Sequence, residues 1–332
     1  MSQALHSTPV ASACRPNAAV CDVTVIIVSY NTRLLTLQCL RSVLAETRHC
    51  SLEIIVVDNA SVDGSVEAIA RQYPGVTLIA NHENRGFAAA NNQGLRLARG
   101  RYVLLLNPDT VILDGAIDRI VAYADQRPEL GIVGCQVLQD EHTVQPTCFA
   151  FQTPLNLLLS FSGLSRLWPR NRWLARPEMG WWARDSEREV DVVSGMFMLV
   201  RAAALRQVGP MDEGYFVYGE EADWCYRFRR AGWPCCFAPV ARILHVHGGG
   251  QSTDQRSVPM YVQNQKSVLL FNRKHYGRAA YYAAKAVYVG AMLVRAAAWG
   301  MQALLGRHAA RHQVRQATAA LRFHLLGTEP AK

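Results

Sequence analysis

The turn Asn107-Pro108-Asp109 carries a carboxylate that could bind a metal ion. It follows directly on the apolar run Tyr102–Leu106, which predicts a buried strand. Pro108 ends that strand and presents Asp109 at its carboxyl end. Carboxylate oxygens are preferred ligands of Mg²⁺ and Mn²⁺, so Asp109 is a candidate metal ligand. Asn-Pro-Asp is also ordinary turn chemistry, and alone it favours that structural interpretation.

Polar residues also follow a second apolar run, Leu52–Val57. Asp58 and Asn59 come first, and a carboxylate there could accept a hydrogen bond from a nucleobase N–H or a ribose hydroxyl. Ser61 and Asp63 come next, and the structural interpretation, an Asx turn and helix capping by these residues, is as well supported as the functional one. These residues alone leave both interpretations open.

A third candidate is the loop Asn84-Arg85-Gly86, which opens a predicted helix, Phe87–Arg99, that begins with small residues. The free N–H groups at the start of a helix attract phosphate, and Arg85 would add positive charge. No GxGxxG sequence follows the first apolar run, so the pattern is not a dinucleotide-binding fingerprint.

Three acids, Glu220, Glu221 and Asp223, stand at the start of another predicted helix, Glu220–Ala231. Acids at a helix N-terminus are stabilising by about 0.3–1 kcal/mol each, which is the structural explanation. The functional explanation is a carboxylate that removes a proton from a hydroxyl group. Glu221 and Asp223 cannot both face one ligand on a regular helix, so we expect one to be the base and the other to support the structure.

Two histidines, His245 and His247, alternate on the predicted strand Phe237–His247 and so share one face. A histidine on a strand is usually structural. His247 runs directly into Gly248-Gly249-Gly250, where a ligand could approach the backbone closely.

The order of elements places most of these residues together. Apolar runs alternate with segments of helical spacing, which predicts β-α-β-α-β-α-β: strands Val23–Val28, Leu52–Val57, Val76–Ala80 and Tyr102–Leu106, and helices Arg33–Thr47, Val66–Tyr73 and Phe87–Arg99. Such a chain folds into a parallel sheet with right-handed crossovers. Ligands of these sheets bind beyond the carboxyl ends of the strands, where the polar clusters after strands one, two and four converge.

Further strands are predicted at Gly131–Val137 and Val190–Val200, with a long irregular stretch at 146–185 between them. Near the C-terminus, residues 286–305 are apolar apart from Arg295 and Gln302, and basic residues flank them. Because a central arginine disfavours insertion by about 2.5–3.5 kcal/mol, we expect a helix on the membrane surface rather than a packed domain helix or a true span. We therefore predict three regions: a flexible tail 1–22, a catalytic domain 23–255 and a basic, apolar helical region 256–332.

Composition agrees with a folded intracellular protein. Half of the 332 residues are apolar, which allows a sizeable core. The net charge of +9 comes largely from the chain beyond Arg256, which suits an anionic membrane or nucleic acid. The nine cysteines include no CxxC pair, and residues 1–22 hold no apolar run of signal-peptide length, so we expect reduced cysteines and no export signal.

Taken together and in order, seven blocks resemble family 2 glycosyltransferases of the GT-A fold, particularly bacterial rhamnosyltransferase-like members. The resemblance covers roughly residues 23–255. Each block alone is weak, whereas all of them in this order are specific: VIIVSYN (25–31), VVDNAS (56–61), NRGFA (84–88), LLNPD (105–109), SGMF (194–197), YGEEAD (218–223) and HGGGQS (247–252).

The resemblance implies an α/β, Rossmann-like, mostly parallel sheet with helices on both faces, followed by a C-terminal helical, membrane-associating region. It implies a nucleotide-sugar donor bound with Mg²⁺ or Mn²⁺, and Asp109 and His247 at the metal or diphosphate. It implies that Tyr30 brackets the nucleobase and that Asp58 is its polar partner. The donor side would comprise Ser29, Tyr30, Asn31, Asp58, Asn59, Arg85, Gly86, Asn107 and Asp109, and the acceptor side Ser194, Gly195 and Glu220.

Two positions depart from the family pattern. Asn107 replaces the first acid of the DxD turn, so Asp109 is the one sure carboxylate on the metal. Glu221 stands where the family has Asp as the general base; we favour Glu221 as the base and keep Asp223 as its competitor.

We expect inverting transfer of a sugar, foremost L-rhamnose from dTDP-rhamnose and otherwise a hexose from a UDP-sugar. The acceptor would be a lipid-linked or cell-surface glycan, handled by a cytoplasmic enzyme peripheral to the inner face of an anionic cell membrane, with no nucleic acid as partner. The alternatives are a sugar-phosphate nucleotidyltransferase and a non-catalytic membrane-binding protein. The first loop has no glycine, which disfavours the nucleotidyltransferase.

Overall fold

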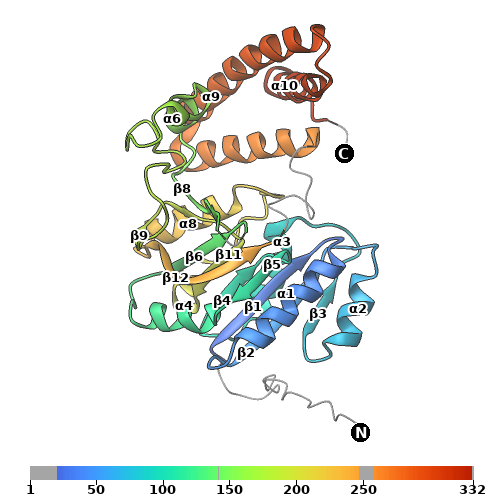
Figure 1. Cartoon of the computed structure of the whole chain (residues 1–332), viewed down its shortest axis with the longest axis vertical. Coiled ribbons are helices and arrows are strands. Elements are labelled where there is room, and N and C mark those ends of the chain that lie inside the picture. The colour runs from blue at the N-terminus through green and yellow to red at the C-terminus, as the bar shows by residue number, and fades with distance from the viewer. Residues whose placement is uncertain (1–20, 141, 247–256, 331–332) are drawn as a thin grey trace.

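Parallel strands form the N-terminal half of the central sheet (Figure 1). Strand β1 pairs in parallel with both β2 and β4, and β2 pairs in parallel with β3, which gives the order β3-β2-β1-β4. The predicted alternation of strands and helices is therefore confirmed, with ends that differ by one or two residues. The elements are β1 (Val23–Ser29), α1 (Arg33–Glu46), β2 (Leu52–Asp58), α2 (Ser65–Gln72), β3 (Thr77–Ala80), α3 (Phe87–Leu97) and β4 (Tyr102–Leu106).

This computed structural model describes residues 21–140, 142–246 and 257–330. Within them, the sheet continues from β4 in mixed orientation in the order β11-β6-β12-β5. Strand β11 is antiparallel to β4 and β6, β12 is parallel to β6, and β5 is antiparallel to β12. The added elements are β5 (Thr110–Leu113), α4 (Ala116–Asp125), β6 (Ile132–Leu138), β11 (Phe197–Arg201), α7 (Ala202–Val208), α8 (Glu220–Arg230) and β12 (Cys235–His245).

The predicted single strand Val190–Val200 is wrong. The chain forms β10 (Val192–Val193), which pairs with β8 (Cys148–Phe149), and then leaves strand geometry at residues 194–196 before β11 begins. The break has a physical reason: Val192–Val193 belong to a separate two-stranded sheet, so the chain must change sheets. The short strands β7 (Val144–Gln145) and β9 (Arg188–Glu189) extend the main sheet beside β6 and β12.

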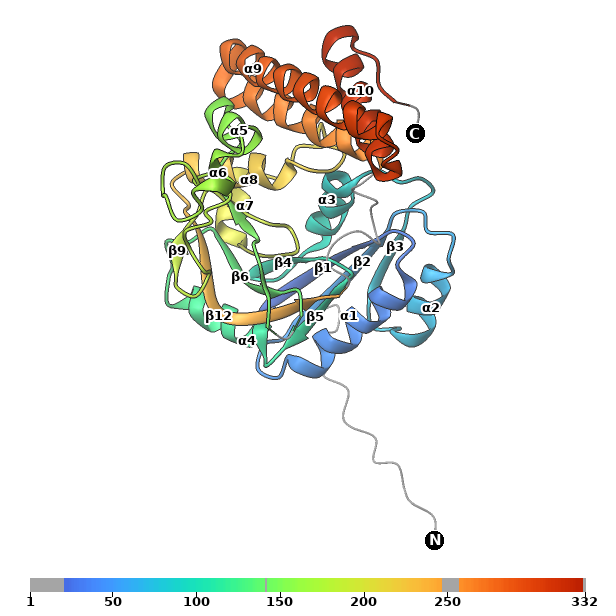
Figure 2. The same cartoon turned by 45° about the horizontal axis from the view of Figure 1, so that its top comes forward.

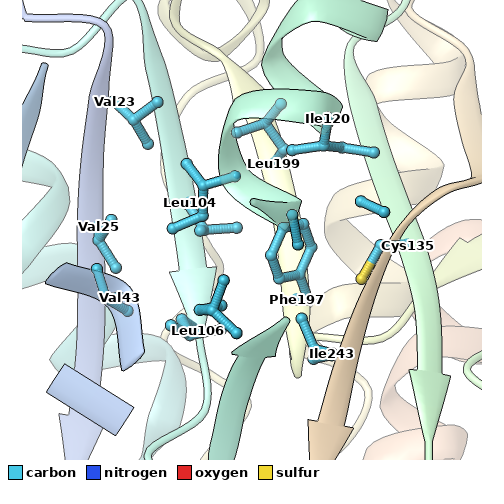
Figure 3. Close-up of a cluster of buried hydrophobic side chains, with 14 of the residues drawn as sticks. Val23, Val25, Val43, Leu104, Leu106, Ile120, Cys135, Phe197, Leu199 and Ile243 are labelled. Atoms are coloured by element: carbon cyan, nitrogen blue, oxygen red, sulfur yellow. The ribbon is translucent and has the colours of Figure 1, made fainter. Parts of the chain in front are cut away.

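Apolar side chains fill both faces of the central sheet, because most of its strands are covered by helices on either side. Val25, Leu104 and Phe197 lie on the face that packs against α1 and α4 (Figure 3). Alternate residues of the same strands point to the opposite face, where Ile26 and Leu105 pack with residues of α3 and α8. This core fixes the strand ends that carry the polar clusters.

The stretch 146–185, expected to be irregular, contains two short helices, α5 (Pro154–Phe161) and α6 (Leu164–Leu167). Thr153 caps α5 by accepting a hydrogen bond from the backbone N–H of Asn156, and Pro154 occupies the first turn, where it is tolerated. Helix α5 packs against the C-terminal helices and joins them to the domain.

The C-terminal region consists of α9 (Val258–Leu304) and α10 (His308–Leu326). Gly277, with φ of +82°, interrupts α9, and the two arms fold back on each other (Figures 1 and 2). Leu269 of the first arm (258–276) packs with Ala284 of the second arm (278–304), and Val262 packs with Met292. The arms are therefore antiparallel, and α10 packs on them as a third helix.

The apolar run 286–305 lies in the second arm of α9. By length and composition alone, α9 contains an 18-residue window apolar enough to cross a membrane, and only 11% of that window is buried. Its exposed side chains include Leu293, Val294, Met301 and Leu304, the last 88% exposed. The run thus packs one side on neighbouring helices and leaves an apolar side uncovered.

Candidate active site

The carboxyl ends of β1, β2 and β4 meet at one edge of the sheet, as the sequence predicted. Ser29 at the end of β1 lies beside Asp58 at the end of β2. The backbone N–H of Asn59 donates to the carbonyl of Ser29 at 2.8 Å, so the two strand ends stay joined where the loops begin. Asn107 follows β4 on the other side of β1.

Asp58 is fully buried, yet only one of its oxygens is engaged. Its Oδ1 accepts from the backbone N–H of Ser61 at 2.8 Å, whereas Oδ2 has no hydrogen-bond partner within the described part of the chain. A buried carboxylate oxygen without a partner is costly, so such an atom marks a place where a ligand donor fits. Asp58 is therefore compatible with both interpretations left open by the sequence: Oδ1 shapes the turn, and Oδ2 has no partner among the described residues.

The two loops beside Asp58 are tied to each other. The backbone N–H of Asn31 donates to Ser61 Oγ at 2.8 Å, and Asn31 Oδ1 accepts from the N–H of Val62 at 2.8 Å. These contacts hold Tyr30 at the rim with 37% of its surface exposed, where its ring can stack on a planar group. Asn31 thus acts by positioning the loop.

Ser29 is buried and hydrogen-bonds with the hydroxyl groups of Thr32 and Thr36, each at 3.2 Å. It therefore anchors the start of α1 behind the site. Asp63 likewise supports the loop: its oxygens accept from the backbone N–H of Arg33 at 2.8 Å and of Ser65 at 3.1 Å.

Asn59 connects the strand end to the loop at residues 84–86. Its Nδ2 donates to Asn84 Oδ1 at 3.2 Å and to the carbonyl of Gly86 at 3.1 Å. Gly86 has φ of +81°, and a Cβ there would lie 2.3 Å from the carbonyl oxygen of Phe216, so only glycine fits. Arg85 between them is exposed, which leaves its guanidinium available to an anion.

Asp109 is buried next to His245, which was expected to share a strand face with His247 but was not a predicted ligand. Its Oδ2 lies 3.2 Å from His245 Nε2, and His245 Nδ1 lies 2.9 Å from Gln145 Oε1. Asp109 Oδ1 is buried and has no hydrogen-bond partner in the described ranges. His247 lies outside the described residues.

A divalent cation is consistent with this arrangement, because Oδ1 of Asp109 is an unpartnered carboxylate oxygen at the sheet edge. Among the described residues, no group of three or more His, Cys, Asp or Glu side chains is arranged to hold a metal ion. An ion held here would therefore draw several ligands from elsewhere, and the phosphates of a nucleotide are suitable ones.

Glu221 lies in a cavity of about 160 Å³ between α8, the 192–194 segment and the first arm of α9. Its Oε1 accepts the backbone N–H of Gly195 at 3.3 Å. Burial raises the pKa of Glu221 above its usual 4.5, although backbone hydrogen bonds such as this one oppose the shift. A carboxylate with a raised pKa in a cavity is suited to accept a proton from a hydroxyl group.

Glu220 lies next to Glu221 but is almost completely buried, and its Oε2 has no hydrogen-bond partner among the described residues. Burial and the neighbouring charge of Glu221 raise the pKa of Glu220 well above its usual value. Two carboxyl groups that share one site disfavour double ionisation, and the pKa is raised further at Glu220 than at Glu221.

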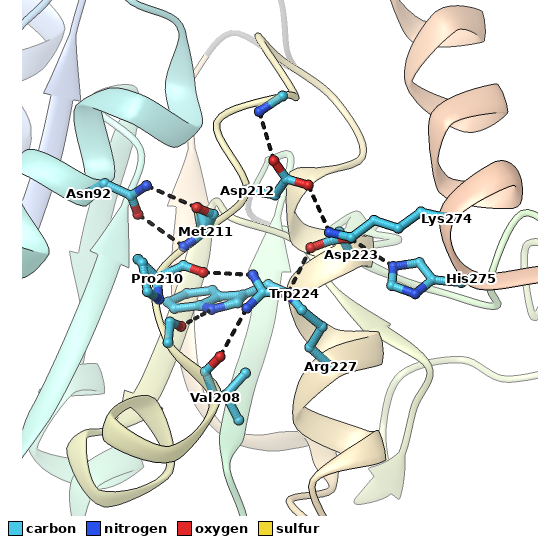
Figure 4. A network of polar contacts seen from close by, with 12 residues as sticks. Asn92, Val208, Pro210, Met211, Asp212, Asp223, Trp224, Arg227, Lys274 and His275 are labelled. Atoms are coloured by element: carbon cyan, nitrogen blue, oxygen red, sulfur yellow. Dashed lines mark hydrogen bonds and ion pairs between the residues drawn. The ribbon is translucent and has the colours of Figure 1, made fainter.

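Asp223 has no free oxygen. Its Oδ1 accepts from Lys274 Nζ at 2.6 Å and contacts His275 Nε2 at 2.7 Å, and its Oδ2 accepts from Arg227 Nε at 2.8 Å (Figure 4). Burial alone would raise the pKa of Asp223, but hydrogen bonds from His275, Lys274 and Arg227 outweigh burial and lower it to about 2. These contacts favour Glu221 over Asp223 as the candidate base.

The segment Ser194-Gly195-Met196 joins the two halves of the site. The carbonyl of Met196 accepts from the N–H of Asn107 at 3.1 Å, while the N–H of Gly195 donates to Glu221. Ser194 lines the same cavity as Glu221. The turn that carries Asp109 and the helix that carries Glu221 are thus linked through one short break between strands.

Comparisons with known proteins agree with this geometry. The profile described as glycosyl transferase family 2 matches residues 24–152. N-acetylglucosaminyl-diphospho-decaprenol L-rhamnosyltransferase of Mycobacterium tuberculosis is 31% identical over 234 residues, which are 66% of this chain and 74% of that protein. The O-antigen biosynthesis protein RfbC of Myxococcus xanthus is 27% identical over 227 residues, 64% of this chain and 16% of that much longer protein.

Solved structures show the same fold at low identity. The mannosyltransferase PcManGT of Pyrobaculum calidifontis, in complex with GDP-Man and Mn²⁺, has a TM-score of 0.54 at 18% identity and covers 97% of this chain and 92% of its own. GalNAc-T7 with UDP, GalNAc and Mn²⁺ has a TM-score of 0.51 at 15% identity, over 76% of this chain and 48% of that one.

The fold and the family profile define a glycosyltransferase of the GT-A type. The chain belongs to glycosyltransferase family 2 and is a rhamnosyltransferase-like glycosyltransferase. The predicted family, fold class and enzyme class are confirmed, and the nucleotidyltransferase and the non-catalytic binding protein are set aside.

Proposed function

We propose that the protein is an inverting glycosyltransferase that moves L-rhamnose from dTDP-L-rhamnose onto a sugar hydroxyl of a polyprenyl-diphosphate-linked glycan. The observation that carries the proposal is the pairing of a partly buried carboxylate, Glu221, with the donor-side turn at Asp109 through the segment 194–196. The activity named for the mycobacterial relative supports both the sugar and the class of acceptor.

In the proposed reaction, the acceptor hydroxyl oxygen attacks the anomeric carbon as the bond from that carbon to the leaving diphosphate breaks. The hydroxyl proton passes to the carboxylate of Glu221. The N–H of Gly195 donates a hydrogen bond to Oε1 of Glu221, so Oε2 is the oxygen that would receive the proton. One displacement inverts the configuration at the anomeric carbon.

On the donor side, Oδ2 of Asp58 is available for a nucleobase N–H or a ribose hydroxyl, and Tyr30 for stacking on the base. Arg85, which is exposed, would contact a phosphate. Asp109, with His245 beside it, would hold Mg²⁺ or Mn²⁺, which supplies positive charge to the departing diphosphate. Ser29, Asn31, Asn59 and Gly86 keep the proposed donor-binding loops in place.

Thermal-shift measurements with nucleotide sugars test the donor. The full chain is titrated with dTDP-L-rhamnose, UDP-glucose, UDP-N-acetylglucosamine and GDP-mannose, each with and without Mn²⁺. Stabilisation follows occupancy of the native state, so dTDP-L-rhamnose with Mn²⁺ should raise the melting temperature most. A larger shift with a UDP-hexose would replace rhamnose by that sugar, and transfer to a synthetic lipid-linked acceptor would then be measured with it.

We also propose that residues 23–255 form the catalytic domain and that 256–332 bring it to the cytoplasmic face of the membrane as a peripheral protein. Exposed apolar side chains of the second arm and the basic residues around them support this. Flotation with vesicles containing phosphatidylglycerol should recover the protein, and neutral vesicles should recover less. Leu304→Glu should weaken recovery; equal recovery by both vesicle types would contradict the electrostatic part.

A further inference from the structure

A second cavity, about 400 Å³ in volume, lies between α5 and the two arms of α9. It adjoins the cavity of Glu221, because the same side chains line both: Phe149, Ala150, Gln152, Tyr218 and Asn264. A ligand with one end at Glu221 could therefore extend into the helical region. The volume of this second cavity is within the range of small-molecule sites, about 300–1,000 Å³.

Arg295 forms part of the wall of this second cavity. Its Nη1 donates to the hydroxyl of Tyr261 at 3.0 Å, and its guanidinium lies 5.0 Å from the centre of the Phe161 ring. No carboxylate of the described chain lies within 4.0 Å of it. The guanidinium has five N–H donors and shows one such hydrogen bond to the described residues, so it is oriented but not neutralised.

The other polar groups of the cavity leave room for an anion. Among the described residues, Glu178 is the one acid that lines it, and its Oε1 accepts from Ser160 Oγ at 2.8 Å without pairing with Arg295. Gln152 and Asn264 are neutral amides. A partly buried arginine that is not ion-paired, among aromatic rings and amides, is suited to bind phosphate in its planar fork.

We propose that this cavity binds the diphosphate of an isoprenoid-linked acceptor, with Arg295 as its cation. The inference rests on the proposed function and adds the place where the lipid carrier is recognised. The acceptor sugar would lie at Glu221, the diphosphate at Arg295, and the isoprenoid along the apolar wall formed by Leu157, Phe161 and Tyr288. The neighbours of Arg295 on the second arm, Leu293 and Val294, are exposed apolar residues and face the proposed membrane contact.

This assignment also explains an arginine in the middle of an apolar helix. The arm 278–304 needs no charge at position 295 for packing, since its core contacts are made by Ala284, Tyr288 and Met292. A role confined to orienting Tyr261 would be served by any hydrogen-bond donor of similar reach. The positive charge serves the contact with the Phe161 ring, and an anion bound in the cavity would use the N–H groups of Arg295 that make no hydrogen bond to the described residues.

Isothermal titration of the full chain with farnesyl diphosphate tests the inference, with inorganic pyrophosphate and farnesol in parallel. Wild type should bind farnesyl diphosphate more tightly than either fragment. Arg295→Gln should weaken it by about 10- to 100-fold, the usual effect of losing charge-assisted hydrogen bonds. Arg295→Lys should fall between the two. Arg311→Gln, which removes the same charge from an exposed position on α10, should bind like wild type.

Equal binding of farnesyl diphosphate by wild type and Arg295→Gln, or no binding by wild type, would overturn the inference. Pyrophosphate bound as tightly as farnesyl diphosphate would mean a free-anion site and would overturn the lipid assignment. Each variant's thermal shift with dTDP-L-rhamnose and Mn²⁺ reports whether the variant is folded. If Arg295→Gln does not fold, Arg295→Lys is compared with wild type instead. If wild type shows no thermal shift with dTDP-L-rhamnose and Mn²⁺ but still binds farnesyl diphosphate, the result counts against the proposed function alone.

Discussion

The backbone N–H of Gly195 lies 3.3 Å from Oε1 of Glu221, and a Cβ at position 195 would lie 3.2 Å from that same oxygen. The ring of Phe87 would also lie 3.2 Å from this Cβ. Gly195 therefore allows the carboxylate to approach the backbone between β10 and β11. The proposed base is oriented by a position that tolerates no side chain without movement.

Gly195→Ala should lower kcat because the added methyl group displaces Glu221 from its hydrogen bond. Donor binding should stay unchanged, since the atoms nearest to the added methyl group belong to Glu221 and Phe87, which are not proposed donor residues. The Mn²⁺-dependent thermal shift with dTDP-L-rhamnose measures this. Gly290→Ala is the matched control, as a Cβ there meets nothing within 4 Å. Unaltered kcat in Gly195→Ala would argue against positioning by this glycine.

Replacing each candidate base by its amide should show which residue acts in catalysis and which stabilises the fold. Glu221→Gln should reduce kcat by about 10²- to 10⁴-fold with little change in melting temperature, because it removes a general base and keeps the shape. Asp223→Asn should destabilise the protein by about 3 kcal/mol, because it breaks a buried ionic network. Steady-state kinetics and urea unfolding are measured on both variants. The reverse pattern would make Asp223 the base.

The pH dependence of stability should reveal the Asp223 network. The pKa of Asp223 falls from 3.8 to about 2 in the folded chain, so the unfolded chain binds its proton first as the pH falls. The stabilisation is therefore complete above about pH 4 and is lost between pH 4 and 2. The difference in free energy of unfolding between wild type and Asp223→Asn should shrink over that window. A constant difference would mean that the carboxylate charge is not what stabilises α8 against α9.

The pH dependence of activity should reflect a raised pKa, that of Glu221, rather than a lowered one. Burial raises the pKa of Glu221 above 4.5, so the carboxyl group still holds its proton at a pH where an exposed glutamate has lost it. Because the proposed base must be ionised, kcat/KM should rise with pH through a midpoint above 4.5. The same profile measured on Glu221→Asp should shift or flatten. A midpoint that stays fixed in this variant would place the titrating group elsewhere.

Much of the donor side could be predicted from the sequence, because it depends on local order. Strands one, two and four end at Ser29, Asp58 and Leu106, and parallel pairing brings such ends together. The contact of Asp109 with His245 could not be predicted, because it requires β12 to pair with β5. Strand β5 is only four residues long and follows directly on the turn at Asn107, so the sequence pattern did not indicate it. The role of Asp223 likewise depends on Lys274 and His275, about fifty residues further along the chain.

Asp109→Asn should abolish the Mn²⁺-dependent part of the thermal shift with the nucleotide sugar, and activity should fall with it. The substitution keeps the size of the side chain and removes the charge that a divalent cation needs. Asp114→Asn is the control, since Asp114 is an exposed acid whose contact is a surface ion pair with Arg242. His245→Gln should weaken the apparent affinity for Mn²⁺ less than Asp109→Asn does, because His245 contacts Asp109 Oδ2 and leaves Oδ1 in place. A full metal response in Asp109→Asn would move the ion away from this turn.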